Sequence, residues 1–405
     1  MSQVNPPPLP SPPVAAAAGA VAWPDPRRAA AFRAWLAGIA APYQLREATL
    51  RTASADASFR RYLRIDSGAG ASFIIMDAPP ERENSEPFVR IARLMQEAGL
   101  NVPRVLAWDE AAGFLLLSDL GTRTLIEVLD RERPHANQGL YLRALDALLA
   151  WQRASRPGVL PPYDAVLLQR ELALFPDWYL ARHRGVAVEG ALRETLDNTF
   201  ATIVARNLAA PSVYVHRDFM PRNLMAPTLV ASRTALPPGG AGLAWGGPAR
   251  RPMTPEPPAE GAVDMRLGVL DFQDAVYGPI TYDIASLMRD AFLSWEEDFV
   301  LDITVRYWER ARQAGLMDFE DWHSDFGAFY RGVEWMGLQR HLKVAGIFAR
   351  LTLRDGKPKY LQDAPRFIGY IRATASRYRE LTPLLRLIDR VEGTQAATGY
   401  AFGRI

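Results

Sequence analysis

The chain has 405 residues, about half of them apolar, and a formal net charge of +2. This length predicts two lobes or domains with sizeable cores. The near-neutral charge gives no sign of a nucleic-acid partner. There is no cysteine, which excludes disulfides, thiolate catalysis and cysteine-based zinc sites. No apolar run reaches the roughly 20 residues of a membrane span, and the short run 14–23 follows no lysine or arginine of the kind that begins a secretory signal, so we expect a cytoplasmic protein without a membrane partner.

Residues 1–24 form a proline- and alanine-rich segment whose composition supports neither a helix nor a strand ladder. We expect a disordered tail, with a proline-rich ligand for another protein as the alternative. Asp25 followed by Pro26 is typical of a helix start, because a carboxylate caps the first turn and proline fits its first position. Apolar residues at helical spacing extend this helix to about Ile39.

A strand meander is predicted over residues 43–77, where three apolar runs alternate with short turns. Residues 54–58 form a small polar turn between the first two strands. Such a turn suits a loop laid over phosphates, because backbone amides and the hydroxyls of Ser54 and Ser58 can donate hydrogen bonds. The turn contains no glycine, so an ordinary hairpin turn is the alternative.

A helix is predicted from Glu86 to about Ala98, and the position of Glu86 in its first turn suits the helix dipole. Residues 113–121 then form a buried strand that runs into a turn. We interpret residues 25–120 as a small, β-rich N-lobe.

Helical patterns dominate residues 121–405, which we interpret as a larger C-lobe, and the longest pattern covers 329–351. Residues 228–262 interrupt this lobe, and 12 of the 22 residues in 237–258 are proline or glycine. Such a segment cannot bury enough apolar surface to order itself, so we expect a flexible insertion that is dispensable for folding.

Two stretches carry the residue types of a phosphoryl-transfer site. VYVHRDFMPRNLM holds His216, Arg217 and Asp218, with Asn223 five positions after the aspartate, and LGVLDFQDA places Asp271 after an apolar run. Phosphoryl transfer needs a carboxylate that takes the proton of an attacking hydroxyl, and an amide oxygen and a second carboxylate that hold Mg²⁺ against the phosphates. In order and spacing, the two stretches match the kinase signatures H-R-D-x-x-x-x-N and D-F.

These patterns predict Asp218 as the general base and Asn223 with Asp271 as ligands of Mg²⁺, with ATP as the phosphoryl donor. His216 and Arg217 complete the predicted catalytic group. The alternative is structural, with Asp218 in a solvated turn and Asp271 capping a helix.

Four side chains from two stretches are predicted to contact the acceptor: Gln169, Glu171, Trp178 and Arg340. The first three precede the catalytic stretch, and the fourth belongs to the long helical pattern. For each of them, core packing or a solvated face is the alternative. Asp283, at the start of a helix predicted after the second motif, either caps that helix or braces the catalytic stretch.

At these motifs the chain resembles the aminoglycoside phosphotransferase family, the small-molecule branch of the protein-kinase-like fold. The family's H-x-D-x-x-x-x-N stands here as His216, Asp218 and Asn223, and its second motif begins at Asp271. The resemblance covers roughly residues 45–351 without the insertion. It implies an α+β, two-lobed fold, with a nucleotide-binding N-lobe and a C-lobe that carries the catalytic and acceptor-binding residues.

Three longer phrases, VHRDFMPRNLM, GVLDFQDAVYGPITYDIASLMRDAF and LQRHLKVAGIFARL, are similar to a bacterial branch of that family. This branch uses ATP to phosphorylate the anomeric hydroxyl of N-acetylmuramate or N-acetylglucosamine in peptidoglycan recycling. The resemblance therefore implies a sugar and ATP as small-molecule partners and Mg²⁺ as the cofactor. An aminoglycoside or other small-molecule kinase of the same fold, and a non-catalytic kinase-like scaffold, stay open as alternatives.

The resemblance also implies where the nucleotide binds. The strand at 113–121 would lead into the hinge beside adenine, which adds Ser118 to the predicted nucleotide contacts Ser54 and Ser58. Glu86 has, besides its helix-dipole role, the alternative of orienting a nucleotide-binding base.

One departure from the family concerns the third strand, which usually carries a lysine that binds the phosphates. Here residues 73–76 contain no basic residue, while Arg60, Arg61 and Arg64 lie on the neighbouring strand. Because arginine can hold a phosphate through two parallel hydrogen bonds, Arg61 is predicted to replace the lysine.

Overall fold

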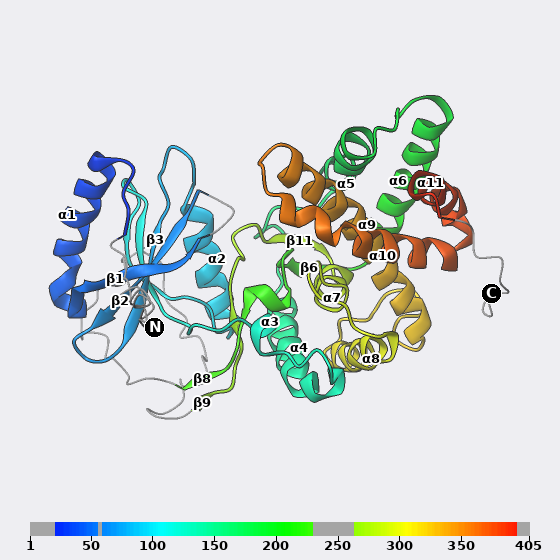
Figure 1. Cartoon of the computed structure of the whole chain (residues 1–405). Coiled ribbons are helices and arrows are strands. Elements are labelled where there is room, and N and C mark those ends of the chain that lie inside the picture. Colours follow the sequence, from blue (N-terminus) through cyan, green and yellow to red (C-terminus); the bar gives the residue numbers. More distant parts are fainter. Residues whose placement is uncertain (1–20, 56–58, 230–262, 395–405) are drawn as a thin grey trace, which may run out of the picture.

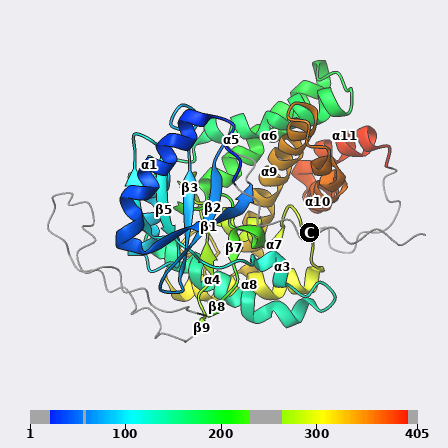
Figure 2. The same cartoon turned by 60° about the vertical axis from the view of Figure 1, so that its left-hand side comes forward.

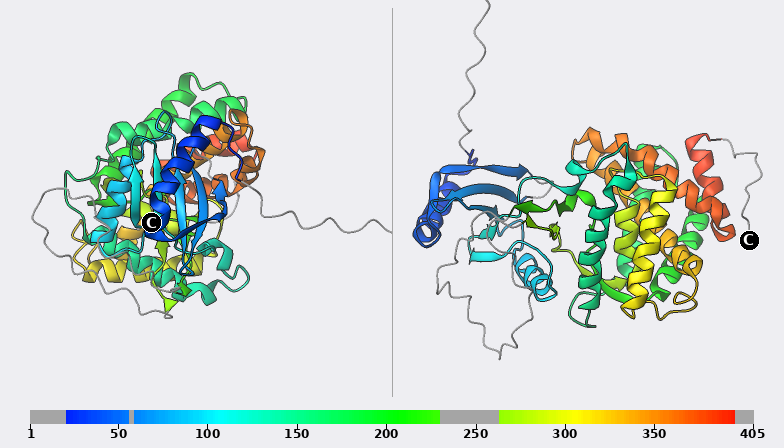
Figure 3. Two further views of the ribbon diagram at one scale, coloured as in Figure 1. Left: turned by 90° about the vertical axis from the view of Figure 1, so that its left-hand side faces the viewer. Right: turned by 90° about the horizontal axis from the view of Figure 1, so that it is seen from below.

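The computed structural model describes residues 21–55, 59–229 and 263–394. They form two lobes, a small one built on a sheet and a larger one built of helices (Figures 1 and 3). The predicted two-lobed α+β fold is therefore confirmed. Of the predicted tail at 1–24, only 21–24 lies within the described residues.

The N-lobe combines a five-stranded sheet with two helices. The strands lie side by side in the order β1-β2-β3-β5-β4, and every neighbouring pair is antiparallel. In chain order the elements are α1 Pro26–Tyr43, β1 Leu45–Ala55, β2 Arg61–Ser67, β3 Ser72–Asp77, α2 Glu86–Glu97, β4 Val105–Asp109 and β5 Phe114–Ser118.

The two faces of this sheet pack against different partners. Helix α1 lies across the outer face (Figure 2), where Phe32 and Leu36 join Leu63 and Ile65 of β2 in one apolar cluster. Full burial of such a side chain contributes about 1.5–3 kcal/mol. The opposite face meets α2 and the C-lobe, so alternate residues along β2 point toward the space between the lobes.

Local sequence signals determine where α1 begins. The Asp25 side chain accepts a 2.8 Å hydrogen bond from a backbone amide of the first turn, and Pro26 is the first helical residue, so the predicted start is confirmed. The helix runs to Tyr43 instead of Ile39 and ends where Gln44 adopts a left-handed conformation, with φ 54°. The edge strand β4 escapes prediction because all its residues are half-buried, so no apolar alternation marks it.

The C-lobe is organised around the long, largely buried helix α9. Its α-helices are α3 Leu125–Val128, α4 Gln138–Arg153, α5 Ala165–Leu172, α6 Gly190–Ala209, α7 Thr281–Met288, α8 Glu297–Gln313, α9 Phe326–Leu353, α10 Ala364–Arg377 and α11 Thr382–Glu392. Shorter helical segments are η1 Pro134–Asn137, the π-helix η2 Phe175–His183, η3 Pro221–Asn223, η4 Pro358–Asp363 and η5 Arg379–Leu381. Gly346 permits close packing on α9, because a Cβ there would lie 2.3 Å from the Leu174 backbone oxygen. None of the described helices has both the length and the apolar character needed to cross a membrane.

Short antiparallel ladders hold the two sequence motifs together. The paired strands are β6 Ser212–Val215 with β11 Val276–Pro279, and β7 Leu224–Met225 with β10 Gly268–Val269. The loop between β6 and β7 carries Asp218, and the loop between β10 and β11 carries Asp271. Pairing of their flanking strands therefore brings these two loops side by side.

The predicted insertion begins and ends in a further ladder. Strand β8 Thr228–Leu229 pairs with β9 Val263–Asp264, so both ends of the segment leave the lobe together. Residues 230–262 lie outside the described part of the chain. The flexibility and dispensability of 228–262 therefore stay predictions.

Candidate active site

A cavity of about 560 Å³ lies between the lobes and contains both motifs. Its volume is in the range of small-molecule sites. On the N-lobe side it is lined by Tyr62, Arg64, Ile74, Phe88, Ser118 and Asp119, among others. On the C-lobe side it is lined by Asp218, Arg222, Asn223, Asp271, Tyr282, Phe292, Arg340, Lys343, Phe348 and Tyr360, among others.

Asp283 holds the loop that carries the predicted base. Its carboxylate accepts hydrogen bonds from the backbone amides of His216 (2.7 Å) and Arg217 (3.0 Å). Burial raises the pKa of Asp283 to about 7. Arg217 has φ 75°, a conformation that costs a non-glycine residue energy unless its surroundings hold it. Asp283 therefore braces this loop, and it does not cap α7, whose N-cap is Ile280.

His216 supports Asp218 from beneath the loop. It is buried, and its Nδ1 accepts a hydrogen bond from the Asp218 backbone amide (3.3 Å). Burial lowers the pKa of His216 to about 4, so the imidazole is neutral at pH 7 and Nδ1 can act as an acceptor. Asp218 itself lines the cavity, and its carboxylate receives no hydrogen bond from the described residues.

Glu171 lies at the centre of a buried ionic cluster beside this loop. Its Oε1 is 2.5 Å from Nη2 of Arg217 and 2.8 Å from Nζ of Lys343, while Tyr163 donates to its other oxygen. Burial alone would raise the pKa of Glu171, but Lys343 and Arg217 outweigh it, and the pKa lies below its ordinary value. Glu171 is therefore ionised at neutral pH and holds both cations in place.

Asn223 and Asp271 join the two loops. Nδ2 of Asn223 donates to the Asp218 backbone oxygen (2.9 Å) and to Oδ2 of Asp271 (3.1 Å), and Nε2 of Gln273 donates to Oδ1 of Asp271 (3.0 Å). This orientation leaves Oδ1 of Asn223 without a partner among the described residues. One carboxylate and one amide oxygen are hard ligands that suit Mg²⁺.

The protein ligands at this position are few. Within the described chain, no group of three or more histidine, cysteine or acidic residues could hold a metal ion alone. Mg²⁺ usually keeps several waters and takes further ligands from the phosphates of a nucleotide. Asn223 and Asp271 therefore fit a metal that arrives with a nucleotide.

Comparison with known proteins places this geometry in a family. A model described as "Phosphotransferase enzyme family" matches residues 49–228 and 263–322. The chain belongs to this phosphotransferase family. The membership that the motifs suggested is thus confirmed, and it makes the chain an ATP-dependent phosphotransferase.

Relatives of this phosphotransferase match along most of its length. A protein from Neisseria meningitidis serogroup B, named N-acetylmuramate/N-acetylglucosamine kinase, is 43% identical over 91% of this chain and 97% of its own. A protein of the same name from Pseudomonas aeruginosa is 45% identical over 86% of this chain and 90% of its own. The structure of the ADP-bound aminoglycoside phosphotransferase APH(2'')-Ib covers 84% of this chain and 97% of its own with a TM-score of 0.50. Its identity of 11% shows a shared fold alone.

Among the described residues, the cation that lines the N-lobe side of the phosphotransferase cavity is Arg64. Side chains alternate along a strand, and both Tyr62 and Arg64 of β2 line the cavity. Arg61 lies on the other face, where it pairs with Asp77 (2.5 Å) and stacks on Trp23. Arg61 therefore does not line the cavity, as its predicted role would require, and Arg64 is the candidate in its place.

Arg64 lies opposite the third strand, β3, on which the family usually carries its lysine. It is the cross-strand partner of Ile74, the β3 residue that lines the cavity. Asp119 pairs with Arg64 at 2.6 Å, and the Gly121 backbone oxygen accepts from it at 2.7 Å. Sequence reasoning missed Asp119. The sequence did contain a signal for Arg64. Buried Leu63 lies between Tyr62 and Arg64, so the alternation of a strand places Tyr62 and Arg64 on the same face.

The other predicted nucleotide contacts have different outcomes. Ser118 lines the cavity, although its hydroxyl already accepts a backbone hydrogen bond of 2.8 Å. Glu86 pairs with Arg90 one turn along α2 (3.3 Å) and does not line the cavity. Its first-turn role in the helix is thus favoured over contact with a base. The side chain of Ser54 and the whole of Ser58 lie outside the described part of the chain.

Of the four predicted acceptor contacts, Arg340 lines the cavity. It is 2% exposed and donates to a backbone oxygen of the segment after α7. Glu171 lies in the buried ionic cluster, behind the cations that it neutralises. Gln169 is exposed on α5, and Trp178 is half-buried against the helical core. Neither Gln169 nor Trp178 lines the cavity.

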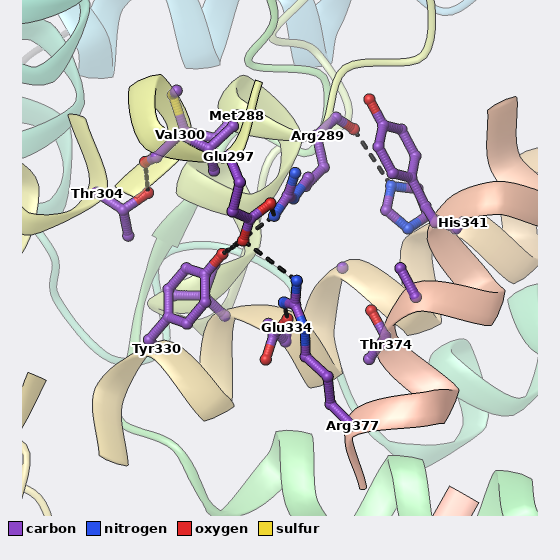
Figure 4. Close-up of a pocket in the computed structure, with 14 residues that line it drawn as sticks. Met288, Arg289, Glu297, Val300, Thr304, Tyr330, Glu334, His341, Thr374 and Arg377 are labelled. Carbon is purple, nitrogen blue, oxygen red and sulfur yellow. Dashed lines mark hydrogen bonds and ion pairs between the residues drawn. The ribbon is translucent and has the colours of Figure 1, made fainter. Parts of the chain in front are cut away.

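A second cavity, of about 50 Å³, lies among α7, α8, α9 and α10 (Figure 4). Its charged residues pair with one another. Glu297 contacts Arg289 (2.6 Å) and Tyr330 (2.8 Å), and Arg377 contacts Glu334. The space holds a few water molecules at most. We assign this cluster, with its internal partners, a structural role in the phosphotransferase.

Proposed function

We propose that this phosphotransferase transfers the γ-phosphoryl group of ATP to the anomeric C1 hydroxyl of N-acetylmuramate or N-acetylglucosamine. The observation that carries the proposal is the meeting of Asp218, Asn223 and Asp271 at one cavity. The identity of 43% and 45% to relatives named for these two sugars supports the acceptor. The sugar 1-phosphates formed would serve peptidoglycan recycling.

Asp218 is the general base of the proposed reaction. Its carboxylate takes the proton of the acceptor hydroxyl, and the sugar oxygen bonds to the γ-phosphorus. The bond from that phosphorus to the β–γ bridging oxygen breaks, and ADP leaves with the electron pair. The anomeric hydroxyl is more acidic than other sugar hydroxyls, so a carboxylate can accept its proton late in a loose transition state.

Asn223 and Asp271 are the proposed metal ligands, with Gln273 fixing the Asp271 carboxylate. When bound there, Mg²⁺ would neutralise charge on the phosphate oxygens. Arg64 is proposed to contact the phosphates from the N-lobe side. Two hydrogen bonds to the Asp119 carboxylate fix the orientation of the Arg64 guanidinium before a nucleotide binds.

The charge of the C-lobe half supports a sugar over an aminoglycoside as the acceptor. Arg222, Arg340 and Lys343 line this half, where Asp218 and Asp271 are the acidic residues. Of these three cations, Arg222 has no carboxylate partner among the described residues. Aminoglycosides carry several positive charges, which this arginine would repel. A neutral or anionic sugar meets no such repulsion.

The decisive experiment is a product analysis. Enzyme, MgATP and each amino sugar are incubated, and phosphorus–proton coupling in the product identifies the phosphorylated carbon. A 1-phosphate couples to the anomeric proton and loses the reducing end. Coupling to the C6 protons, or a product that still reduces, would refute the anomeric assignment, and turnover of an aminoglycoside alone would refute the acceptor.

A further inference from the structure

Four cations line the described part of the cavity: Arg64, Arg222, Arg340 and Lys343. Three of them are already engaged. Arg64 pairs with Asp119 and Lys343 with Glu171, while Arg340 is almost completely buried, where its charge acts on Asp283 and Asp290. Before any substrate binds, carboxylates balance the charges of Arg64 and Lys343, and Arg340 is buried with a backbone oxygen as its hydrogen-bond acceptor.

Arg222 differs from the other three. It is exposed, and among the described residues no carboxylate and no backbone oxygen accepts a hydrogen bond from it. Its guanidinium lies over the Phe292 ring, 4.5 Å from the ring centre. A guanidinium stacked on an aromatic face is held in one plane, while its N–H groups remain directed outward from the edges.

The position of Arg222 is set by the catalytic loop. It belongs to η3 Pro221–Asn223 and directly precedes Asn223, which is held through the Asp218 backbone oxygen and Asp271. Phe292 packs against Phe348, which also lines the C-lobe half. The guanidinium is therefore on the acceptor side of the cavity, close along the chain to the proposed base.

The two proposed acceptors differ in charge at one place. N-acetylmuramate carries a lactyl carboxylate on the oxygen at C3, whereas N-acetylglucosamine carries a hydroxyl there. A carboxylate is the natural partner of a guanidinium, because the two groups form parallel, charge-assisted hydrogen bonds. An unpaired arginine that lines the same cavity as the base, four residues after it in the chain, thus matches one of the two sugars better than the other.

We propose that Arg222 is the specificity-determining residue that binds the acceptor carboxylate, and so sets the preference for N-acetylmuramate over N-acetylglucosamine. This inference rests on the proposed function. It replaces Arg170, Arg340 and Lys343 as candidates for this contact, because Arg170 is exposed on α5 away from the cavity and the other two are engaged.

The test compares kcat/KM for the two sugars in the full-length protein and in R222A and R222K. A lost charge-assisted contact corresponds to about 10–100-fold. We therefore expect the ratio of kcat/KM, N-acetylmuramate over N-acetylglucosamine, to fall by about 10–100-fold in R222A, chiefly through KM for N-acetylmuramate. R222K keeps the charge but not the planar fork, so its ratio should fall less.

R170A is the matched control, because Arg170 is an exposed arginine outside the cavity, and its ratio should equal that of the wild type. A ratio unchanged in R222A, or equal losses with both sugars, would overturn the inference; equal losses would assign Arg222 to the transferred phosphoryl group. If the wild type turned over neither sugar, the proposed function itself would fail. Melting temperatures of all variants separate misfolding from these outcomes.

Discussion

The phosphotransferase contains two clusters of charged side chains that use their charges differently. In the small C-lobe cluster, Glu297 pairs with Arg289, and Arg377 pairs with both Glu297 and Glu334. In the inter-lobe cavity, the Asp218 carboxylate and the Arg222 guanidinium have no such partners among the described residues.

This difference has a physical basis. Removing a charge from water costs free energy that a protein normally recovers through internal hydrogen bonds and ion pairs. Where the charged groups of a cluster all pair with one another, none is available to a ligand. Such pairing in the small C-lobe cluster stabilises the packing of α7 to α10. Charged groups without an internal partner at an open cavity are available to a substrate. We therefore expect activity to depend on the cluster in the inter-lobe cavity, and stability to depend on the small C-lobe cluster.

The largest effect should follow from removing the proposed base. Asp218→Asn keeps the size of the side chain but cannot accept a proton, so we expect kcat to fall by roughly 10²–10⁴-fold with little change in KM for ATP. Steady-state kinetics with either amino sugar measure this. Asp177→Asn, on the exposed face of η2, is the control; near-normal turnover by Asp218→Asn would assign the proton transfer elsewhere.

Removal of a metal ligand should have the next largest effect. Asp271→Ala loses a carboxylate that no neighbour replaces, and we expect a fall in kcat on the order of 10³-fold and a raised Mg²⁺ requirement. Gln273→Ala removes only the amide that orients Asp271, through the hydrogen bond from Nε2 to Oδ1 (3.0 Å). We therefore expect kcat to fall by about 10–100-fold in this variant. Mg²⁺ titrations of activity distinguish the two; an unaltered Mg²⁺ dependence in Asp271→Ala would exclude this metal site.

The engaged arginine of the nucleotide half should have a smaller effect, in binding. Arg64→Leu removes the proposed phosphate contact, and we expect KM for ATP to rise by about 10-fold or more, with KM for the sugar unchanged. Arg61→Leu is the matched control, because Arg61 lies three positions away on the opposite face of β2. Equal effects of the two substitutions on KM for ATP would contradict the reassignment.

The self-paired cluster should respond in stability alone. Arg377→Met leaves the buried Glu334 with Tyr378 as its remaining partner, and we expect a loss of about 1–2 kcal/mol in the free energy of unfolding, since the Arg377 side chain is 41% exposed. Denaturant titration measures the loss, and kcat should stay close to the wild-type value. Arg379→Met, an exposed neighbour, is the control. A large fall in kcat at full stability would show that the two clusters are coupled.

The final prediction concerns the pH dependence of stability. The pKa of His216 is about 4 in the folded protein, against 6.5 ordinarily, so the unfolded chain binds more protons in this range and stability falls as pH falls through it. Asp283, whose pKa burial raises to about 7, acts in the opposite direction. We therefore compare the wild type with His216→Asn. Between pH 7 and pH 5, the free energy of unfolding should fall by about 2 kcal/mol less in His216→Asn than in the wild type. Identical pH dependence of their unfolding free energies would show that His216 titrates normally.

The sequence alone determined the elements of this site that depend on short-range order. The offset from Asp218 to Asn223 and the Asp-Phe pair after an apolar run specify both the chemistry and the loops that carry it. Asp25 and Pro26 determined where α1 begins, because capping is a contact within one turn. Helical and strand periodicity predicted most of the elements, since each period states which face is buried, while the two-lobed arrangement followed from the chain length and the family resemblance.

Only the tertiary structure decided which charges are used internally. Residues an odd number of positions apart point to opposite faces of a strand, and so Arg64 reaches the cavity while Arg61, three positions earlier, pairs with Asp77. Lys343 and Arg222 are both plain cations in the sequence. Their difference arises because α5 brings Glu171 to Lys343, whereas no element brings a described carboxylate to Arg222. Whether a charged residue has a structural role or is available to a substrate depends on its partners. These partners are distant along the chain, so local sequence patterns cannot reveal them.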